Sequence, residues 1–140
     1  MPIKEIISKI RGAFSEVVLD ITESAGENIL HIEGNAVTDV LKIFKDYGFN
    51  FLADITAVDN LTLGGFKRFV VVYHLLSHET AERITVKAYV NESNQELPSV
   101  ESLWKTADWQ EREIYDLFGI RFAGHPNQIR IMNPDDFVGH

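Results

Sequence analysis

The chain has 140 residues, a formal net charge of −8 and no cysteine, and this length suits one domain with its own hydrophobic core. The acidic balance argues against a nucleic-acid partner and against direct docking on anionic lipid, because both require clustered Lys and Arg. Without cysteine the chain lacks the usual ligands of iron–sulfur clusters, attached haem and zinc knuckles, and no apolar run approaches the roughly 20 residues of a membrane span.

The first part of the chain alternates between helical and strand-like patterns. Isoleucines at helical spacing predict an amphipathic helix over residues 3–13. Short β-branched runs at 16–22 and 28–32, with a polar turn between them, predict a hairpin. Asn35 is expected to cap a second helix, which keeps its apolar period until Gly48 ends it.

The middle of the chain is rich in strand candidates, at residues 49–58, 66–76 and 84–90. A loop over 91–98 then leads to Ser99, which is expected to cap a short turn before the last helix. The order of elements is α-β-β-α-β-β-β-α. It predicts an α+β, two-layer fold in which helices pack on one face of a mostly antiparallel sheet.

The last predicted helix carries signals at both of its ends. Asp108 is expected to cap the start, and Glu111, three residues later, is placed to reach back to the free N–H in a capping box. Gly119 supplies the left-handed residue that closes such a helix.

Two acids on this helix lie among apolar residues. At 100° per residue, Glu111 falls between two aromatic side chains, and Glu113 falls between Trp109 and Leu117. Both carboxylates are therefore expected to be partly buried and to need cationic or backbone partners. A core helix with two internal ion pairs and a functional site explain this pattern equally well.

The chain after this helix has no sustained helical or strand period. It contains Gly, Pro and Asn together with scattered apolar residues, and a structureless run of about twenty residues is unusual inside a compact domain. An arm that lies on a partner protein would explain it. We therefore expect a single α+β domain over residues 1–120, which ends in the last helix, and an extended C-terminal, partner-binding arm over 121–140.

Candidate catalytic sites are weak by comparison. His74 lies on the predicted strand over 66–76, and His78 lies in the loop directly after it. Residues four apart along an extended chain are about 13 Å from each other, so the two histidines form no metal pair. A divalent metal held by Glu113, Asp116 and His125 is sterically possible, and a stand-alone metal-dependent enzyme is kept as an alternative. No glycine-rich phosphate loop and no G-x-S-x-G elbow occurs, so no catalytic centre is expected in this chain.

A long string in the last third of the chain closely resembles the signature of one family. The matching residues are Glu111, Arg112, Glu113, Tyr115, Asp116, Leu117, Phe118, Gly119, Ile120, Phe122, Gly124, His125, Pro126, Arg130, Ile131, Met132, Pro134, Asp135 and Asp136. That family is the C subunit, or 30-kDa subunit, of respiratory complex I, NADH:quinone oxidoreductase. The resemblance extends upstream through the strand at 69–77 and the segment at 54–59, and covers essentially the whole chain.

The resemblance implies a non-redox assembly subunit in the peripheral arm of the proton-translocating complex. It implies no cofactor or metal in this chain, and NADH, FMN, iron–sulfur clusters and quinone in partner subunits. The expected place is the cytoplasmic face of the cell membrane, as a peripheral protein, and the charged start of the chain predicts no signal peptide. The expected partners are the D (49-kDa) subunit and a cluster-bearing neighbour.

The resemblance also implies which residues bind those partners. They are Glu111, Arg112, Glu113, Asp116, His125, Pro126, Arg130, Asp135 and Asp136. This chain departs from the family in having Ile129 before Arg130, where two adjacent arginines are usual, and in lacking the usual basic tail after residue 140. Energy-converting membrane hydrogenases and coenzyme F420H2 dehydrogenases use a similar module, so the equivalent subunit of either is a further alternative.

Overall fold

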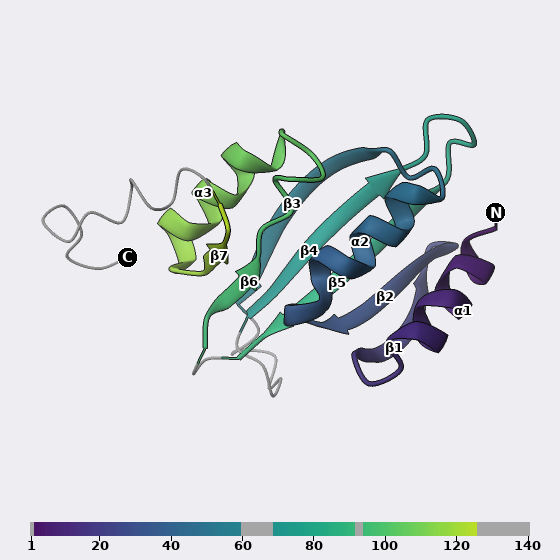
Figure 1. Cartoon of the computed structure of the whole chain (residues 1–140), viewed down its shortest axis with the longest axis horizontal. Helices are drawn as coiled ribbons and strands as arrows, with labels where there is room; N and C mark the ends of the chain where they lie inside the picture. Colours follow the sequence, from purple (N-terminus) through teal and green to yellow (C-terminus); the bar gives the residue numbers. More distant parts are fainter. Residues whose placement is uncertain (1, 60–68, 92–93, 126–140) are drawn as a thin grey trace, which may run out of the picture.

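The computed structural model describes residues 2–59, 69–91 and 94–125, and Figure 1 shows their arrangement. The helices are α1 (Ile3–Ala13), the 3-10 helix η1 (Gly34–Ala36), α2 (Val37–Asp46) and α3 (Ala107–Phe118). The strands are β1 (Val18–Ser24), β2 (Glu27–Glu33), β3 (Phe51–Asp59), β4 (Phe69–Leu76), β5 (Arg83–Val90), β6 (Glu96–Pro98) and β7 (Arg121–Ala123).

The main sheet has the strand order β1-β2-β5-β4-β3. Its neighbours pair antiparallel except β2 and β5, which pair parallel, because the chain crosses over between them through α2, β3 and β4. The two short strands β6 and β7 form a separate parallel pair, with Leu97 opposite Phe122. The predicted α+β class and the mostly antiparallel sheet are confirmed.

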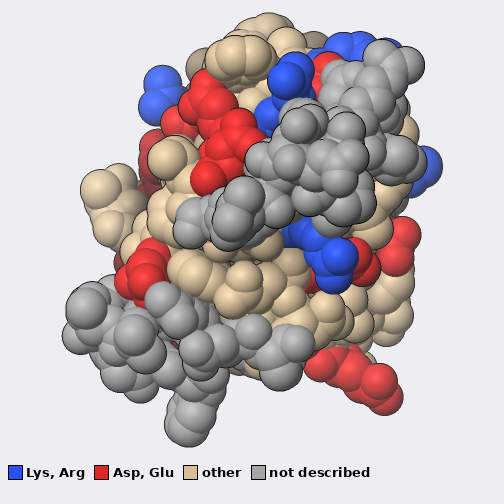
Figure 2. Space-filling view, turned by 90° about the vertical axis from the view of Figure 1, so that its left-hand side faces the viewer, with Lys and Arg blue, Asp and Glu red and all other residues tan. Residues whose placement is uncertain are grey.

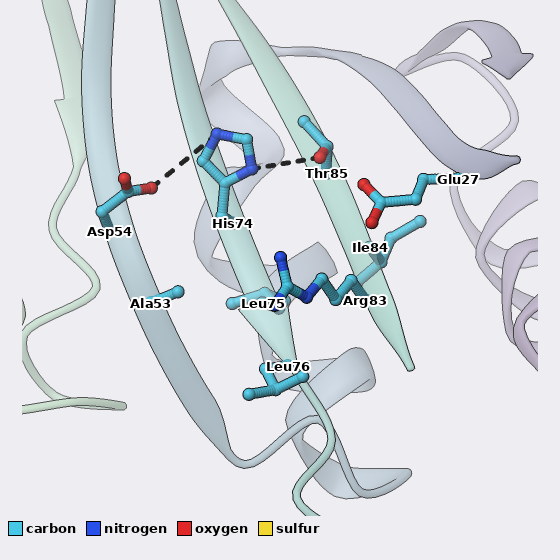
Figure 3. A pocket seen from close by; sticks show the side chains of 9 residues that line it. All are labelled: Glu27, Ala53, Asp54, His74, Leu75, Leu76, Arg83, Ile84 and Thr85. Carbon is cyan, nitrogen blue, oxygen red and sulfur yellow. Dashed lines mark hydrogen bonds and ion pairs between the residues drawn. The ribbon is translucent and has the colours of Figure 1, made fainter. Parts of the chain in front are cut away.

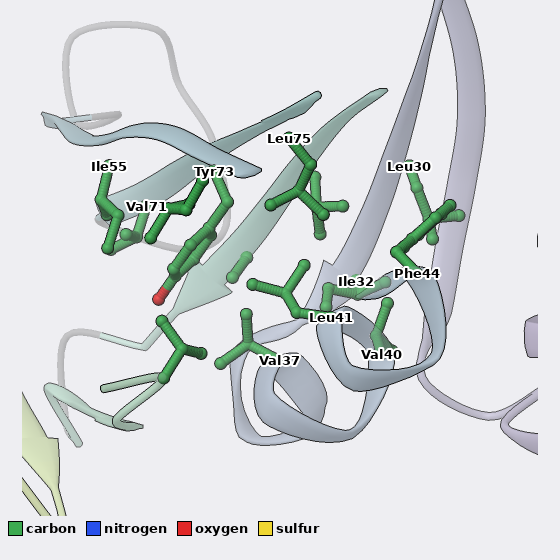
Figure 4. Packing of buried hydrophobic residues seen from close by; sticks show 14 of the residues in the cluster. Leu30, Ile32, Val37, Val40, Leu41, Phe44, Ile55, Val71, Tyr73 and Leu75 are labelled. Carbon is green, nitrogen blue, oxygen red and sulfur yellow. The ribbon is translucent and has the colours of Figure 1, made fainter. Parts of the chain in front are cut away.

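Helices α1 and α2 form the second layer on one face of the sheet (Figure 1). Helix α1 buries Ile3, Ile6, Ile7 and Ile10, and α2 buries Val37, Val40, Leu41 and Phe44. Figure 4 shows these α2 side chains meeting Leu30 and Ile32 of β2 and Val71, Tyr73 and Leu75 of β4. Burying each such side chain contributes about 1.5–3 kcal/mol, so this shared face is the main source of stability.

Helix α3 lies at the β3 edge of the sheet (Figure 1). Its last residue, Phe118, meets Phe69 of β4 edge to face, with ring centres 5.9 Å apart. The side-chain amide oxygen of Gln110 accepts a hydrogen bond from the backbone N–H of Ile55 in β3. One end of α3 is therefore packed by an aromatic pair, and its middle is bonded to the backbone of the edge strand.

The predicted helix starts are wrong in detail. Asn35 lies inside η1, and α2 has Ala36 at its N-cap with no side-chain hydrogen bond. Helix α3 begins at Ala107 after Thr106, so Asp108 sits inside its first turn and forms no capping box with Glu111. Both acids instead bond to residues distant in sequence, as described below. The expected end is confirmed, because Gly119 takes the left-handed conformation, with φ 72°.

Two short strands lie where the sequence predicts none. Strand β6 falls inside the expected loop over 91–98, and β7 falls at the start of the predicted arm. The buried Phe122 of β7 belongs to the core. Residues 126–140 of the predicted arm, and residues 66–68 of the predicted strand over 66–76, lie outside the described residues.

Candidate functional site

The carboxylate of Glu111 is the most deeply buried acid that the structure describes, with no exposed surface. It accepts hydrogen bonds from the Ser99 hydroxyl at 2.6 Å and from the Val100 backbone N–H at 2.8 Å. Burial raises the pKa of Glu111 from 4.5 to about 7, because desolvation outweighs these two bonds, which lower it. Near neutral pH this buried carboxyl is therefore partly protonated.

His125 is the second buried polar side chain at this place, with 1% of its surface exposed. Its Nε2 lies 2.9 Å from Asp108 Oδ1, 3.0 Å from the Asp108 carbonyl oxygen and 3.8 Å from Glu111 Oε1. Because both Asp108 atoms can only accept, Nε2 carries the proton and donates it. The imidazole thus ties the chain after β7 to the first turns of α3.

The pairing of β6 with β7 supports this arrangement from the other side. The Ser99 backbone N–H donates to the Ala123 carbonyl at 2.8 Å, and the Arg121 N–H donates to the Gln95 carbonyl at 2.9 Å. Ser99 also accepts from the Glu101 N–H at 3.1 Å, which confirms its predicted role as a turn cap. We refer to Ser99, Asp108, Glu111 and His125 as the α3 clamp.

Tyr73 of β4 extends the buried polar region towards the core. Its hydroxyl is fully buried and has no hydrogen-bond partner among the described residues. Burial, and then the charge of Glu111, raise the pKa of Tyr73 well above its usual value of 10.0. This hydroxyl is therefore neutral at any physiological pH, and no bond to a described residue replaces its lost hydration.

The opposite side of α3 faces solvent and carries large apolar side chains. Trp109 is 63% exposed and Leu117 is 72% exposed. Glu113 lies between them and is exposed, so its predicted burial is wrong. The reason is that no described part of this chain covers the apolar stripe on which that prediction rested. Figure 2, which views the molecule from the side on which α3 lies in Figure 1, shows acidic and basic groups scattered among uncharged surface.

Comparison with known proteins decides the family. The family model described as "Respiratory-chain NADH dehydrogenase, 30 Kd subunit" matches residues 30–140. The chain belongs to this 30-kDa subunit family. Among its relatives, the C subunit of the NADH-quinone oxidoreductase of Citrifermentans bemidjiense is 45% identical over 135 residues, which cover 96% of this chain and 83% of that protein. The corresponding C subunit from Moorella thermoacetica is 50% identical over 123 residues, covering 87% and 81%.

Solved structures agree with this membership of the 30-kDa subunit family. A trypsin-resistant fragment (1–134) of Nqo5 superposes with a TM-score of 0.79 and 35% identity, and covers 90% of this chain and 98% of that one. A chain of the archaeal membrane-bound sulfane sulfur reductase gives a TM-score of 0.71 at 24% identity, with 89% and 72% covered. The second likeness shows a shared fold alone.

The predicted site residues of this 30-kDa family member do not form one cluster. Glu111 and His125 meet in the α3 clamp, whereas Glu113 and Asp116 lie exposed on the outer side of α3. Arg112 is half-buried, with its guanidinium carbon 5.7 Å from the centre of the Trp109 ring and its Nε unpaired among the described residues. The other predicted residues lie outside the described ranges: Pro126, Arg130, Asp135 and Asp136. The partner-binding role of all nine residues stays a prediction.

The alternative metal site does not assemble in the described part of the chain. His125 donates to Asp108, so the structure does not bring its imidazole to Glu113 and Asp116. Within residues 2–59, 69–91 and 94–125, no group of three or more His, Asp or Glu side chains could hold a metal ion.

A polar pocket on the main sheet has no counterpart in the sequence predictions. Figure 3 shows His74 of β4 pointing into it, with Nε2 3.7 Å from Asp54 Oδ1 and Nδ1 3.1 Å from Thr85 Oγ1. The pocket has a volume of about 370 Å³, and Arg83 also lines it. Asp54, His74 and Thr85 lie opposite one another on β3, β4 and β5. A correct register for the predicted meander would have placed these three polar residues side by side. The residues that line the pocket include no serine, cysteine or lysine.

Proposed function

We propose that the chain is a subunit of NADH:quinone oxidoreductase that joins neighbouring subunits and carries no redox centre of its own. The names of its relatives support the parent complex, since they are C subunits of NADH-quinone oxidoreductase. The same match favours this complex over a membrane hydrogenase or an F420H2 dehydrogenase. Electrons from NADH would then pass to quinone through flavin and iron–sulfur clusters in other subunits.

The observation that carries the joining role is the two-sided character of α3. Its inner side is fixed by the α3 clamp, while its outer side presents Trp109 and Leu117 to solvent. Large exposed apolar side chains on a rigid element are typical of protein interfaces. The clamp also fixes His125 directly before the segment 126–140, which we propose as the arm that lies on the D subunit.

A peripheral position follows from the same proposal. None of the described helices is long and apolar enough to cross a membrane. We propose that the chain reaches the cytoplasmic face of the cell membrane through its partners, the D subunit and a cluster-bearing neighbour.

Co-purification tests this function directly. The chain is expressed together with the D subunit and the cluster-bearing subunit of its own complex, and the three are expected to elute together from a size-exclusion column. The purified chain alone is expected to show no flavin or iron–sulfur absorbance. A chain that remains a monomer in the presence of both subunits would contradict the joining role, and a bound redox group would contradict the absence of a centre.

A matched pair of variants locates the contact. Trp109→Ala on the outer side of α3 is expected to reduce co-elution, because it removes an exposed aromatic side chain. Leu19→Ser changes an exposed apolar side chain on β1, which is 46% exposed, and is expected to leave co-elution unchanged. Equal loss in both variants would show that the contact does not lie on α3.

A further inference from the structure

A small groove lies between α3 and the outer edge of β3. It has a volume of about 280 Å³, which is below the range of about 300–1,000 Å³ typical of small-molecule sites. Side chains of both elements line it, among them Ile55, Ala57, Gln110, Glu113, Leu117 and Phe118. Its size suits a single long side chain better than a cofactor.

The groove does not offer β3 for pairing at its centre. An exposed edge strand normally invites another strand, because its outward N–H groups are unpaired. Here the Ile55 N–H donates to the side chain of Gln110, so that donor is already satisfied. The occupant is therefore recognised by side chains at this point, not by the addition of a strand.

Glu113 determines the charge of the occupant. It is the one charged residue among those that line the groove, it is exposed, and it makes no ion pair or hydrogen bond with a described residue. The remaining walls are mainly apolar, from Ile55, Leu117 and Phe118. A groove of this kind fits a side chain with a long apolar stem and a cationic head.

Arginine fits this description better than lysine. Its guanidinium is weakly hydrated, binds carboxylates in a planar, two-point geometry and stacks on aromatic rings. Arginine is also among the residues that contribute most binding energy at protein interfaces. A carboxylate between exposed apolar side chains would be costly to cover with a neutral partner, so a cation is required when Trp109 and Leu117 become buried.

We propose that this groove receives an arginine side chain of a partner subunit, whose guanidinium pairs with Glu113 while apolar neighbours cover Leu117 and Trp109. The inference rests on the proposed function, since it assumes that α3 meets another subunit of the complex. It adds the chemical character of the residue that the partner presents.

The test measures, by isothermal calorimetry, how tightly the purified full-length chain binds a preformed pair of the D subunit and the cluster-bearing subunit. Glu113→Gln is expected to weaken binding at least about tenfold, because an arginine left without its carboxylate in a covered site is costly. The variant is also expected to make binding less dependent on salt. The matched control is Glu5→Gln, an exposed glutamate on α1, which is expected to bind like the wild type.

Charge exchange identifies the occupant. Glu113→Arg is expected to abolish binding through repulsion, and one arginine-to-glutamate substitution in the partner is expected to restore it. Melting curves of the isolated chain serve as the folding control. Because Glu113 is exposed, its substitutions should leave the melting temperature unchanged.

Each remaining outcome has a defined meaning. If the wild-type chain binds neither subunit, the proposed function and the arginine site are both wrong. If the wild type binds and Glu113→Gln and Leu117→Ser bind equally well, the function stands and the arginine site is wrong. If the isolated chain forms a dimer in sedimentation equilibrium that Glu113→Gln dissociates, the occupant is a second copy of this chain, which also overturns the partner-subunit proposal.

Discussion

The Glu111 carboxylate on α3 accepts a hydrogen bond of 2.6 Å from the hydroxyl of Ser99, which directly follows β6. This contact joins the last helix to the segment that leads into it. The adjoining Val100 N–H donates to the second oxygen of the same carboxylate at 2.8 Å. A single side chain therefore satisfies two buried donors, and its removal leaves both of them unpaired.

Replacing Glu111 should therefore be far more damaging than replacing its neighbour Glu113. Glu111→Ala is expected to lower the free energy of unfolding by about 2–4 kcal/mol, because two buried donors lose their acceptor and a cavity remains. Glu113→Ala changes an exposed side chain, so a change within about 0.5 kcal/mol is expected. Urea unfolding of both variants measures the difference. Equal losses would contradict the assignment of Glu111 as the structural member of the pair.

The raised pKa of Glu111 makes stability depend on pH. The unfolded carboxyl titrates near 4.5 and the folded one near 7, so between these values the folded state holds a proton that the unfolded state has lost. The contribution of Glu111 to stability is therefore complete below the lower pKa and is lost as the pH rises through the upper one. Above both values this loss amounts to about 3 kcal/mol.

The comparison that isolates this effect uses Glu111→Gln, which keeps the shape of the side chain and does not titrate. Urea unfolding at about pH 5 and about pH 8 should show the wild type losing about 2–3 kcal/mol more than the variant over this interval. Groups that titrate in both proteins cancel in the difference. Parallel pH profiles would show that the folded Glu111 carboxyl is ionised throughout this range.

Tyr73 offers a substitution that should stabilise the protein. Its buried hydroxyl lacks a partner among the described residues, so Tyr73→Phe removes a desolvated polar group and breaks no described bond. A gain of up to about 1 kcal/mol is expected. Tyr89→Phe is the control, because the Tyr89 hydroxyl bonds to His31 Nδ1 at 2.7 Å and its loss should cost about 1 kcal/mol. A loss in Tyr73→Phe would indicate that its hydroxyl bonds to the protonated form of Glu111.

Hydrophobic periodicity predicted the longer helices and strands well, because each of them is long enough for its pattern to be visible. Helix α1 has the predicted bounds, because isoleucines at helical spacing need only one apolar surface to pack against. The strands β6 and β7 have three residues each, too few for an alternating pattern to be visible. The parallel pairing of β2 with β5 joins strands separated by a helix and two further strands, which no local pattern specifies.

The site shows the same limit of local patterns. A capping box is a contact within one helical turn, and the spacing of Asp108 and Glu111 fits it. In the structure, neither side chain makes the capping-box contact. Asp108 binds His125 and Glu111 binds Ser99, which are both outside the helix. For Glu113, the helical period correctly placed it between Trp109 and Leu117. The period could not tell whether that stripe is covered by this chain or left open for another.

Gly34 in η1 packs closely against β6 and β5, so a larger residue there is expected to disturb both strands. A Cβ added there would clash with the Leu97 side chain of β6 and lie 2.8 Å from the carbonyl oxygen of Tyr89 in β5. That carbonyl belongs to a strand inside the main sheet and cannot easily move. Gly34→Ala is therefore expected to cost about 1–3 kcal/mol and to displace Leu97, two residues before Ser99 of the α3 clamp.

Gly12→Ala is the matched control for this substitution. Gly12 lies near the end of α1, and nothing stands within 4 Å of the added Cβ. Alanine there should stabilise the protein by about 0.5–1 kcal/mol through its higher helix propensity. Both substitutions add one methyl group and restrict the unfolded chain equally, so opposite signs in urea unfolding report the packing around Gly34 alone. If Gly34→Ala unfolds at the same urea concentration as the wild type, β6 can shift without cost, and the close contact does not position Ser99.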